Sequence, residues 1–449
     1  MAGLKKVLVA NRGEISVRII RACRELGIAS VAVYSDADEN ALHVRLADEA
    51  VHIGPASARK SYLNVEKLVE VAKERGADAI HPGYGFLAEN AGFSAACREA
   101  GLAFVGPSAE AIERMGDKSA ARELAREAGV PVVPGTEGNA TPEEAVERAG
   151  EIGYPVMVKA AAGGGGRGIR VVESEGDLEK AVKEAAREAE AAFGEGAVYL
   201  EKFLAEPRHV EVQVMGDGEG NVVHFFEREC SIQRRRQKLI EEAPSPGIDQ
   251  QTREEMAVAA VRLAETAGYA NAGTVEFLVD EEGSFYFIEM NTRIQVEHPI
   301  TEAVTGVDLV KEQLKVAGGE GLSVRQEDVA VTGHAMEFRI NAEDPDNDFF
   351  PSPGEVTAVE VPGGPGVRVD TAVFSGYEIP PFYDSMVGKL VVWGSDREEA
   401  MARGRRALAE YRLEGIKTTI PLHLRLLDDE VFVSGGYHTG YLEELLRGT

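Results

Sequence analysis

The segment from residue 289 to residue 297 carries a varied set of polar side chains at every second position. They are Glu289, Asn291, Arg293, Gln295 and Glu297, and apart from one threonine the residues between them are apolar. In an extended chain, alternate side chains point to the same side. The order of types suits a metal ligand, a supporting amide, a clamp for a planar carboxylate-shaped anion, a hydrogen-bonding amide and a base. The alternative is a solvated strand face, which alternation often indicates.

A further acid, Glu276, lies on the preceding strand-like run, and the turn signal 280–283 joins the two runs into a predicted hairpin. If Val279 pairs with Ser284, Glu276 and Glu289 are diagonal neighbours on one face, with Cβ atoms somewhat under about 7–8 Å apart. Two carboxylates this close repel each other unless a cation lies between them. Mg²⁺ or Mn²⁺ bound to phosphates is the expected occupant. A shift of one residue in register would put the two acids on opposite faces.

A glycine-rich segment follows Lys159 and includes Gly164, Gly165 and Gly166. It joins two predicted strands, whereas a Walker loop joins a strand to a helix and ends with Gly-Lys-Ser/Thr. Glycine lets backbone N–H groups approach phosphates closely. We therefore expect a lid that closes over a nucleotide; the alternative is a mobile linker.

The charge balance excludes some partners and creates a requirement. The chain has 48 basic and 76 acidic residues, a net charge of −28, which argues against nucleic acid as a partner. Anionic substrates would need a local basic cluster, and the densest is the run 233–238, which ends in Lys238. Such a run is often only a solvated face.

The overall composition indicates a protein without membrane-spanning helices or disulfide bonds. No stretch of about 18 apolar residues is present, and the N-terminus lacks the core of a signal peptide, so we expect a cytoplasmic protein. Cys23, Cys97 and Cys230 are far apart, which favours isolated thiols over a disulfide framework or a zinc site.

Strand and helix signals alternate over residues 4–113 and predict a parallel sheet. The turn 11–14 lacks the G-x-G-x-x-G fingerprint, so a dinucleotide site is not expected there.

Eight segments in this order and spacing resemble biotin carboxylase, a branch of the ATP-grasp superfamily, over nearly the whole chain. They are residues 10–15, 81–87, 115–118, 201–202, 207–211, 289–298, 339–344 and 380–385. The fold implied is α/β (α+β overall), with three domains. They are an N-terminal, Rossmann-like parallel-sheet domain (1–113), a central ATP-grasp domain (114–330) with a lid subdomain at about 131–203, and a C-terminal mixed β-sheet domain (331–449).

The resemblance also implies a role for each residue that matches a family motif. Expected nucleotide contacts are Lys118, Lys159, Gly164, Gly165, Gly166, Glu201, Lys202, Leu204, His209, Gln233, Arg236 and Leu278. Expected Mg²⁺ or Mn²⁺ ligands are Glu276 and Glu289, supported by Asn291. Expected substrate contacts are Arg293, Gln295 and Val296 for bicarbonate, with Tyr84 and Arg339 for biotin. Expected catalytic residues are Glu297, Lys238, Arg293 and Arg339.

The activity implied is ATP-dependent carboxylation of biotin on a biotin carboxyl carrier protein. Bicarbonate would react through carboxyphosphate to give N1′-carboxybiotin, ADP and phosphate. This is the first half-reaction of acetyl-CoA carboxylase in fatty-acid synthesis, so a carboxyltransferase subunit is a further expected partner. A homodimer is also implied, because Arg21 and Glu25 match interface positions of relatives.

Three alternatives stay open. The chain could be the biotin carboxylase part of a pyruvate or propionyl-CoA carboxylase, another ATP-grasp ligase, or a non-catalytic nucleotide-binding module. Two departures from the family pattern also matter. Arg236 replaces the usual histidine, so we expect ATP affinity to differ. Ala161 and Ala162 replace serine and glycine, so we expect a stiffer lid.

Overall fold

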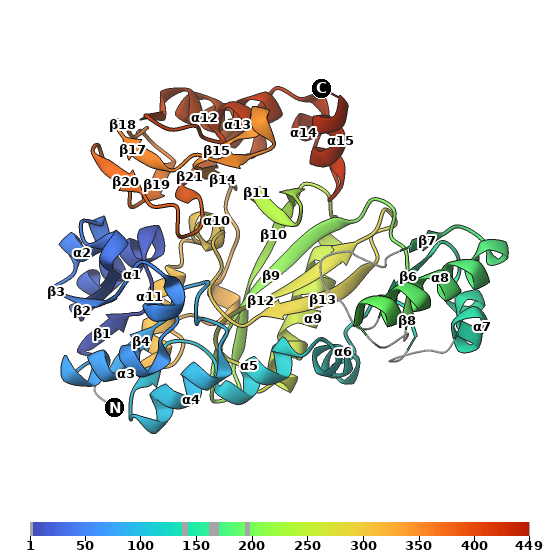
Figure 1. The fold of residues 1–449 in the computed structure, drawn as a ribbon, viewed down its shortest axis with the longest axis horizontal. Coiled ribbons are helices and arrows are strands. Elements are labelled where there is room, and N and C mark those ends of the chain that lie inside the picture. The colour runs from blue at the N-terminus through green and yellow to red at the C-terminus, as the bar shows by residue number, and fades with distance from the viewer. Residues whose placement is uncertain (1–2, 137–141, 161–169, 194–197, 449) are drawn as a thin grey trace.

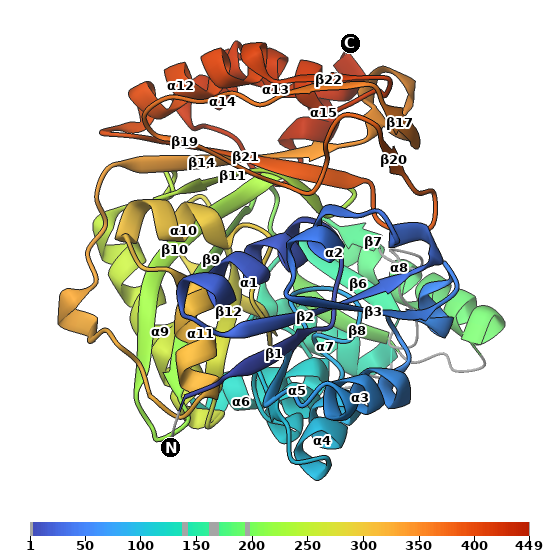
Figure 2. The same ribbon diagram turned by 90° about the vertical axis from the view of Figure 1, so that its left-hand side faces the viewer.

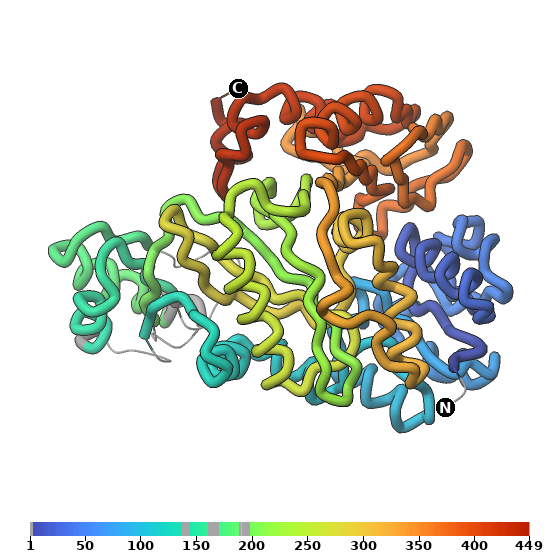
Figure 3. Tube along the Cα trace, turned by 180° about the vertical axis from the view of Figure 1, so that it is seen from behind, coloured from blue at the N-terminus to red at the C-terminus, as the bar shows by residue number. Residues whose placement is uncertain are grey.

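The computed structural model describes residues 3–136, 142–160, 170–193 and 198–448. Within these ranges the chain forms a parallel N-terminal sheet, a large antiparallel sheet, and a small lobe that stands apart from both (Figures 1 and 3). No helix in the described part of the chain is long and apolar enough to cross a bilayer.

The N-terminal sheet is parallel, which confirms the prediction from alternating strand and helix signals. Its order is β3-β2-β1-β4-β5, and helices α3 and α4 pack on one face while α1 packs on the other. Parallel strands are covered on both faces, so their sequences are nearly continuous apolar runs. The strands are β1 (Lys6–Val9), β2 (Ala29–Ser35), β3 (Glu49–Gly54), β4 (Ala79–His81) and β5 (Ala103–Phe104). The helices are α1 (Gly13–Glu25), α2 (Leu42–Leu46), α3 (Val65–Glu74) and α4 (Ala91–Glu99).

The large sheet has eight strands in the order β13-β12-β9-β10-β11-β14-β21-β19, and every neighbouring pair is antiparallel. Strands from the C-terminal third of the chain therefore continue the sheet of the central part. The strands are β9 (Arg208–Asp217), β10 (Val222–Arg234), β11 (Gln237–Ala243), β12 (Ala270–Val279), β13 (Phe285–Asn291), β14 (His334–Asn341), β19 (Val367–Thr371) and β21 (Met386–Gly394).

Helices cover both faces of the large sheet. Helix α9 packs on β9, β10 and β12, whereas α10 packs on β10, β11, β14 and β21. C-terminal helices form a further layer over β14 and β21 (Figure 2). The helices are α9 (Gln250–Thr266), α10 (His298–Thr305), α11 (Leu309–Ala317), α12 (Arg397–Glu410), α13 (Ile420–Leu427), α14 (Glu430–Ser434) and α15 (Tyr441–Gly448). Short strands complete this part: β15 (Glu343–Asp344), β16 (Phe350–Pro351), β17 (Gly354–Val356), β18 (Ala358–Glu360), β20 (Tyr377–Ile379) and β22 (Arg412–Glu414).

The small lobe consists of an antiparallel sheet, in the order β7-β6-β8, and two helices. Its elements are α7 (Pro142–Ile152), β6 (Val156–Ala160), β7 (Arg170–Val172), α8 (Glu175–Phe193) and β8 (Val198–Lys202). Strands β6 and β7 flank the glycine-rich segment and pair as a hairpin, as predicted. The expectations for Ala161, Ala162, Gly164, Gly165 and Gly166 lie outside the described residues.

Two helices, separated at Asp117, lead from the N-terminal sheet toward the large sheet. Helix α5 (Ala109–Gly116) ends before Asp117, and α6 (Lys118–Glu127) begins after it. The Asp117 carboxylate accepts a 2.8 Å hydrogen bond from the backbone of Ala120, so it caps α6. Lys118 therefore lies in the first turn of a new helix that faces the sheet.

The shared sheet predicts that residues 1–330 do not fold as a soluble fragment. Removing residues 331–449 would expose the edge of β11 and the apolar face that holds Ile232, Leu239 and Ile240. An open, apolar sheet edge promotes aggregation. Size-exclusion chromatography of fragment and whole chain should give aggregates for the fragment only; a monodisperse, cooperatively unfolding fragment would contradict this.

Candidate active site

A cavity of about 1150 Å³ lies where the N-terminal part, the large sheet and the small lobe meet. It is large enough for a nucleotide together with a second substrate. Every predicted site residue within the described part of the chain lines it, and the individual roles stay predictions. These residues are Tyr84, Lys118, Lys159, Glu201, Lys202, Leu204, His209, Gln233, Arg236, Lys238, Glu276, Leu278, Glu289, Asn291, Arg293, Gln295, Val296, Glu297 and Arg339.

The predicted register between β12 and β13 is wrong by one residue. Val279 pairs with Phe285 rather than with Ser284. In an uninterrupted ladder this register would place Glu276 opposite Ile288. Glu289 would then point to the other face of the sheet, and the two acids could not share a cation.

A β-bulge restores the shared face. Phe277 pairs with Phe287, but the next pair is Glu276 with Glu289, so Ile288 is an extra residue on β13. The two acids are consequently directly opposite each other instead of diagonal. Burial and then the charge of Glu276 raise the pKa of Glu289, as expected for two neighbouring carboxyl groups.

The segment after β13 keeps its predicted orientation although it is not a strand. β13 ends at Asn291, and Arg293, Gln295 and Glu297 line the cavity from irregular chain that leads into α10. Gln295 and Glu297 are only 2% exposed, which excludes the solvated-face alternative. Ile294 packs into an apolar cluster on the other side and anchors the segment.

Lys238 compensates three buried carboxylates at the centre of the cavity. Its Nζ donates hydrogen bonds of 2.6 Å to Glu211, 3.0 Å to Glu276 and 2.7 Å to Glu297. The three acids come from two strands and from the turn before α10, so one ammonium group ties these elements together. The interaction with these carboxylates outweighs burial and raises the pKa of Lys238 well above its ordinary value.

The basic run 233–238 forms a hairpin and does not act as one positive patch. Arg235 and Arg236 occupy the turn with positive φ angles of 50° and 66°, a conformation uncommon for residues other than glycine. Arg235 pairs with Asp348 at 3.3 Å. Arg236 and Lys238 line the cavity, so two of the four basic side chains in this run lie in the site.

Glu297 is held between two cations. Besides Lys238, the Nη2 of Arg339 donates to it at 2.9 Å, and the Nε of Arg339 donates to Glu241 at 2.6 Å. Burial by itself would raise the pKa of Glu297. The charges of Lys238 and Arg339 outweigh burial and hold this pKa well below its ordinary value. The carboxylate is therefore ionised at neutral pH and able to accept a proton.

Arg228 organises the floor of the site, and sequence reasoning missed it. Its side chain is 0% exposed, and its guanidinium donates to five side chains. The acceptors are Glu211 (2.7 Å), Gln213 (2.8 Å), Thr301 (3.0 Å), Thr274 (3.2 Å) and Gln295 (2.5 Å). Because Arg228 holds the amide oxygen of Gln295, the amide nitrogen donates to Glu276 at 2.9 Å. Glu211, which the sequence reasoning also overlooked, is fixed by Arg228 and Lys238 together.

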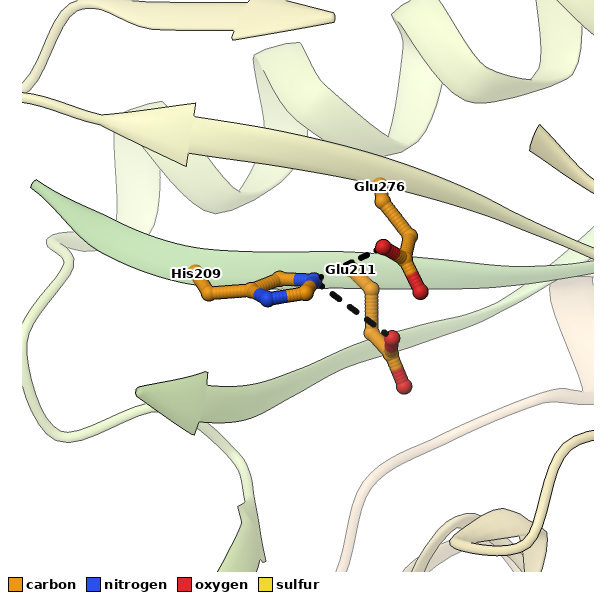
Figure 4. Close-up of side chains that lie close together, drawn as sticks. All are labelled: His209, Glu211 and Glu276. Carbon is orange, nitrogen blue, oxygen red and sulfur yellow. Dashed lines mark ion pairs between the residues drawn. The ribbon is translucent and has the colours of Figure 1, made fainter. Parts of the chain in front are cut away.

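His209, Glu211 and Glu276 lie together on neighbouring strands and point into one space (Figure 4). The Nε2 of His209 is 3.0 Å from Glu276 and 4.0 Å from Glu211. Asn291 donates to Glu276 at 2.8 Å. Hard divalent cations prefer such oxygen ligands, and Glu289 faces the same space without a cationic partner among the described residues. The ligand atoms of His209, Glu211 and Glu276 lie within 4.8 Å of one another, so these three residues could hold a cation, and a cation between Glu276 and Glu289 stays a prediction.

The end of the cavity nearest the small lobe holds a second charge cluster. Glu201 forms ion pairs with Lys159 and Arg122, whose charges outweigh burial and lower its pKa. Lys202 is occupied by the carbonyl groups of Gly153 and Tyr154, at 3.1 and 3.0 Å. These hydrogen bonds hold the ammonium group within the small lobe, so Lys202 lines the cavity with its other atoms.

The N-terminal part contributes two further anchors. Glu89 accepts a 2.9 Å hydrogen bond from Arg293, which also donates to Asn291 at 2.7 Å. Tyr84 donates to Glu14, which lies 3.2 Å from the buried ammonium of Lys389. Lys389 in turn donates to the carbonyl of Val296 at 2.7 Å. Both anchors fix the segment from Arg293 to Val296 against the N-terminal part of the chain.

Comparison with protein families matches three consecutive regions. Residues 3–112 match the biotin carboxylase N-terminal domain, residues 117–325 the ATP-binding domain of the carbamoyl-phosphate synthase L chain, and residues 337–444 the biotin carboxylase C-terminal domain. Together the matched regions span almost the whole sequence.

Individual proteins are similar over the same length. Biotin carboxylase 1 of Bacillus subtilis is 59% identical over 98% of this chain and 98% of its own. A pyruvate carboxylase subunit of Methanothermobacter thermautotrophicus is 57% identical over 99% of this chain and 90% of its own. The biotin carboxylase domain dimer of Hydrogenobacter thermophilus 2-oxoglutarate carboxylase, solved with MgADP, ADP and bicarbonate, is 52% identical over 99% of this chain and 98% of that one, with a TM-score of 0.89.

Replacing Arg228 by methionine should destabilise the fold strongly. The change leaves Glu211 and several amide and hydroxyl groups buried without their donor, and breaking a buried ion pair on one side costs about 3–5 kcal/mol. Urea unfolding measures the change. Arg98→Met, which breaks an exposed pair with Glu110, is the control and should cost less than about 1 kcal/mol. Equal losses for the two variants would contradict the assignment.

Proposed function

Because the chain belongs to the biotin carboxylase family, we propose that it carboxylates biotin attached to a carrier protein. The ATP-dependent carboxylation of biotin is the activity of this family and of this chain. The observation that carries the residue roles is the position of Glu297, which is buried, is hydrogen-bonded to Lys238 and Arg339, and lines one cavity with Arg293.

Glu297 is proposed as the general base. Bicarbonate is a weak nucleophile until a carboxylate takes its proton. Arg293 would hold the bicarbonate oxygens, helped by the amide of Gln295 and the backbone of Val296. The deprotonated oxygen would attack the γ-phosphorus of ATP, so that a P–O bond forms, the bond to ADP breaks and carboxyphosphate results. Lys238 would steady the transferred phosphoryl group.

The nucleotide is proposed to lie between the small lobe and the large sheet. Lys118 and Lys159 would contact its phosphates, while Glu201, Lys202, Leu204, His209, Gln233, Arg236 and Leu278 would surround the nucleoside. Glu276, Glu289 and Asn291 would hold Mg²⁺ or Mn²⁺, which when bound neutralises phosphate charge during transfer. Support comes from the paired acids at the bulge and from the relative solved with MgADP and bicarbonate.

The biotin ring is proposed to enter between Tyr84 and Arg339. Carboxyphosphate would release CO₂ and phosphate, phosphate would take the N1′ proton, and N1′ would bond to CO₂. Arg339 would stabilise the oxyanion that develops on the ureido group.

The downstream acceptor is proposed to be acetyl-CoA, through a carboxyltransferase subunit, because full-length relatives are named biotin carboxylase. A pyruvate carboxylase role is the second candidate, favoured by the Methanothermobacter relative. We further propose a cytoplasmic homodimer. The free, buried cysteines fit a reducing compartment. One solved relative is a dimer, and Arg21 and Glu25 are exposed on α1.

Free biotin should stimulate ATP hydrolysis measured with saturating bicarbonate. The acceptor draws carboxyphosphate forward, so ADP release rises with biotin and carboxybiotin accumulates. A coupled ADP assay with and without biotin measures this. ATP turnover that is indifferent to biotin would favour another ATP-grasp ligase.

Replacing Glu297 by glutamine should reduce bicarbonate-dependent turnover by about 10²–10⁴-fold, the usual contribution of a general base. ATP binding, measured by calorimetry, should be nearly unchanged because the base does not contact the nucleoside. Glu254→Gln, at an exposed position of α9, is the control and should keep full turnover. If E297Q retained wild-type turnover, Glu297 would not be the base.

A further inference from the structure

Two buried carboxyl groups, those of Glu241 and Glu337, lie on the two strands nearest Arg339, and neither has a role in the reaction proposed above. Glu241 on β11 is directly opposite Glu337 on β14, and both are 0% exposed. Directly opposite side chains share one face, with Cβ atoms about 4.5–5.5 Å apart. Oε1 of Glu241 accepts from Arg339, but Oε2 of Glu241 and both oxygens of Glu337 have no hydrogen-bond partner among the described residues.

The cations near Glu337 are engaged elsewhere. On β21, Lys389 is opposite Arg339 and thus diagonal to Glu337, but its Nζ donates to Val296 and pairs with Glu14. Arg339 donates to Glu241 and Glu297. Further titratable groups on the neighbouring elements are Lys238 of β11, Glu297, and His298 and Glu302 of α10. The Nδ1 of His298 is 2.7 Å from the carbonyl of Gln295, and Glu302 pairs with Arg18 and Arg368.

An ionised carboxylate that is fully buried and has no hydrogen-bond partner, as that of Glu337 would be among the described residues, destabilises the folded state. Burying an ion without a partner costs several kcal/mol, and the group takes up a proton instead. The resulting O–H needs an acceptor, and Oε2 of Glu241 is a buried, unused acceptor on the facing residue. Burial raises the pKa of Glu241 to about 7 against the charge of Arg339, and it raises the pKa of Glu337 well above its ordinary value against the charge of Lys389.

We infer that Glu337 carries a proton at neutral pH and donates it to Oε2 of Glu241, which leaves Oε1 of Glu241 as the ionised acceptor for Arg339. The pair then holds one negative charge instead of two beside the guanidinium. Glu337 is thus a positioning residue for Arg339, and only the consequence for biotin rests on the proposed function.

The pH dependence of stability tests the proton directly. Unfolded Glu337 would titrate near about 4.3, so above that pH the folded state binds one more proton than the unfolded state. Stability contributed by this group is then lost as pH rises toward the folded pKa. Glu337→Gln cannot titrate, and its amide can still donate to Glu241. Its melting temperature should therefore gain on the wild type as pH increases from about 5.5 to 8.5.

Glu242, which follows Glu241 on β11, is the matched control. It faces the other side, pairs with Arg397 at 2.7 Å and with His334 at 2.6 Å, and these partners outweigh burial and lower its pKa to about 2. Its stabilisation is complete above the unfolded pKa, so Glu242→Gln should melt lower than the wild type across the whole range. If E337Q also melts lower by an amount that does not shrink with pH, Glu337 is ionised and the inference is overturned.

A measurement on the wild type keeps the inference testable if E337Q fails to fold. Infrared spectra at pH 7.5 should show the carbonyl stretch of a buried, protonated carboxyl group. Its absence would overturn the inference. In folded E337Q this band should lose intensity relative to the wild type, because burial also raises the pKa values of Glu14 and Glu229.

Activity separates this inference from the proposed function. In E337Q the pH at which biotin-dependent turnover declines on the alkaline side should be higher than in the wild type. Bicarbonate-dependent ATP hydrolysis without biotin should keep its pH profile. An alkaline decline at the same pH as in the wild type would overturn the positioning role. Failure of biotin to stimulate even the wild type would count against the proposed function and leave the melting and infrared results unaffected.

Discussion

The ammonium group of Lys238, hydrogen-bonded to Glu211, Glu276 and Glu297, is the interaction on which the site depends. A chain with a net charge of −28 concentrates several acids in one buried cavity. Such a cluster is stable only if cations lie among the carboxylates with good geometry. Lys238, Arg228 and Arg339 are these cations. The same arrangement lowers the pKa of Glu297, so the charges that stabilise the fold also keep this carboxylate ionised.

Much of the site could be predicted because many of its polar residues lie close together in the sequence at regular spacing. The alternation from Glu289 to Glu297 survives although the strand ends at Asn291, since Ile294 anchors the intervening side. The parallel N-terminal sheet followed from alternating apolar runs and helical spacing. The resemblance to biotin carboxylase added residues such as Lys118 and Arg339, which by themselves carry no distinctive sequence signal.

Other features left no local signal. The bulge at Ile288 has neither glycine nor proline, yet it alone puts Glu276 and Glu289 on one face. Arg228 lies in a strand where an arginine predicts exposure, and its five acceptors come from distant segments. The joining of β11 to β14 depends on a pairing across some hundred residues, so the expected C-terminal domain shares its sheet with the central one. Contacts of this kind are fixed by tertiary packing and not by periodicity.

The most direct test of this account is the titration of Glu297 itself. ¹³C NMR of protein labelled at the glutamate side-chain carboxyl carbon, with the Glu297 signal assigned by its loss in E297Q, reports ionisation without reference to turnover. The account predicts an ionised Glu297 down to the lowest pH at which the protein stays folded. A Glu297 that titrates at or above the ordinary glutamate value, about 4.3, would contradict it.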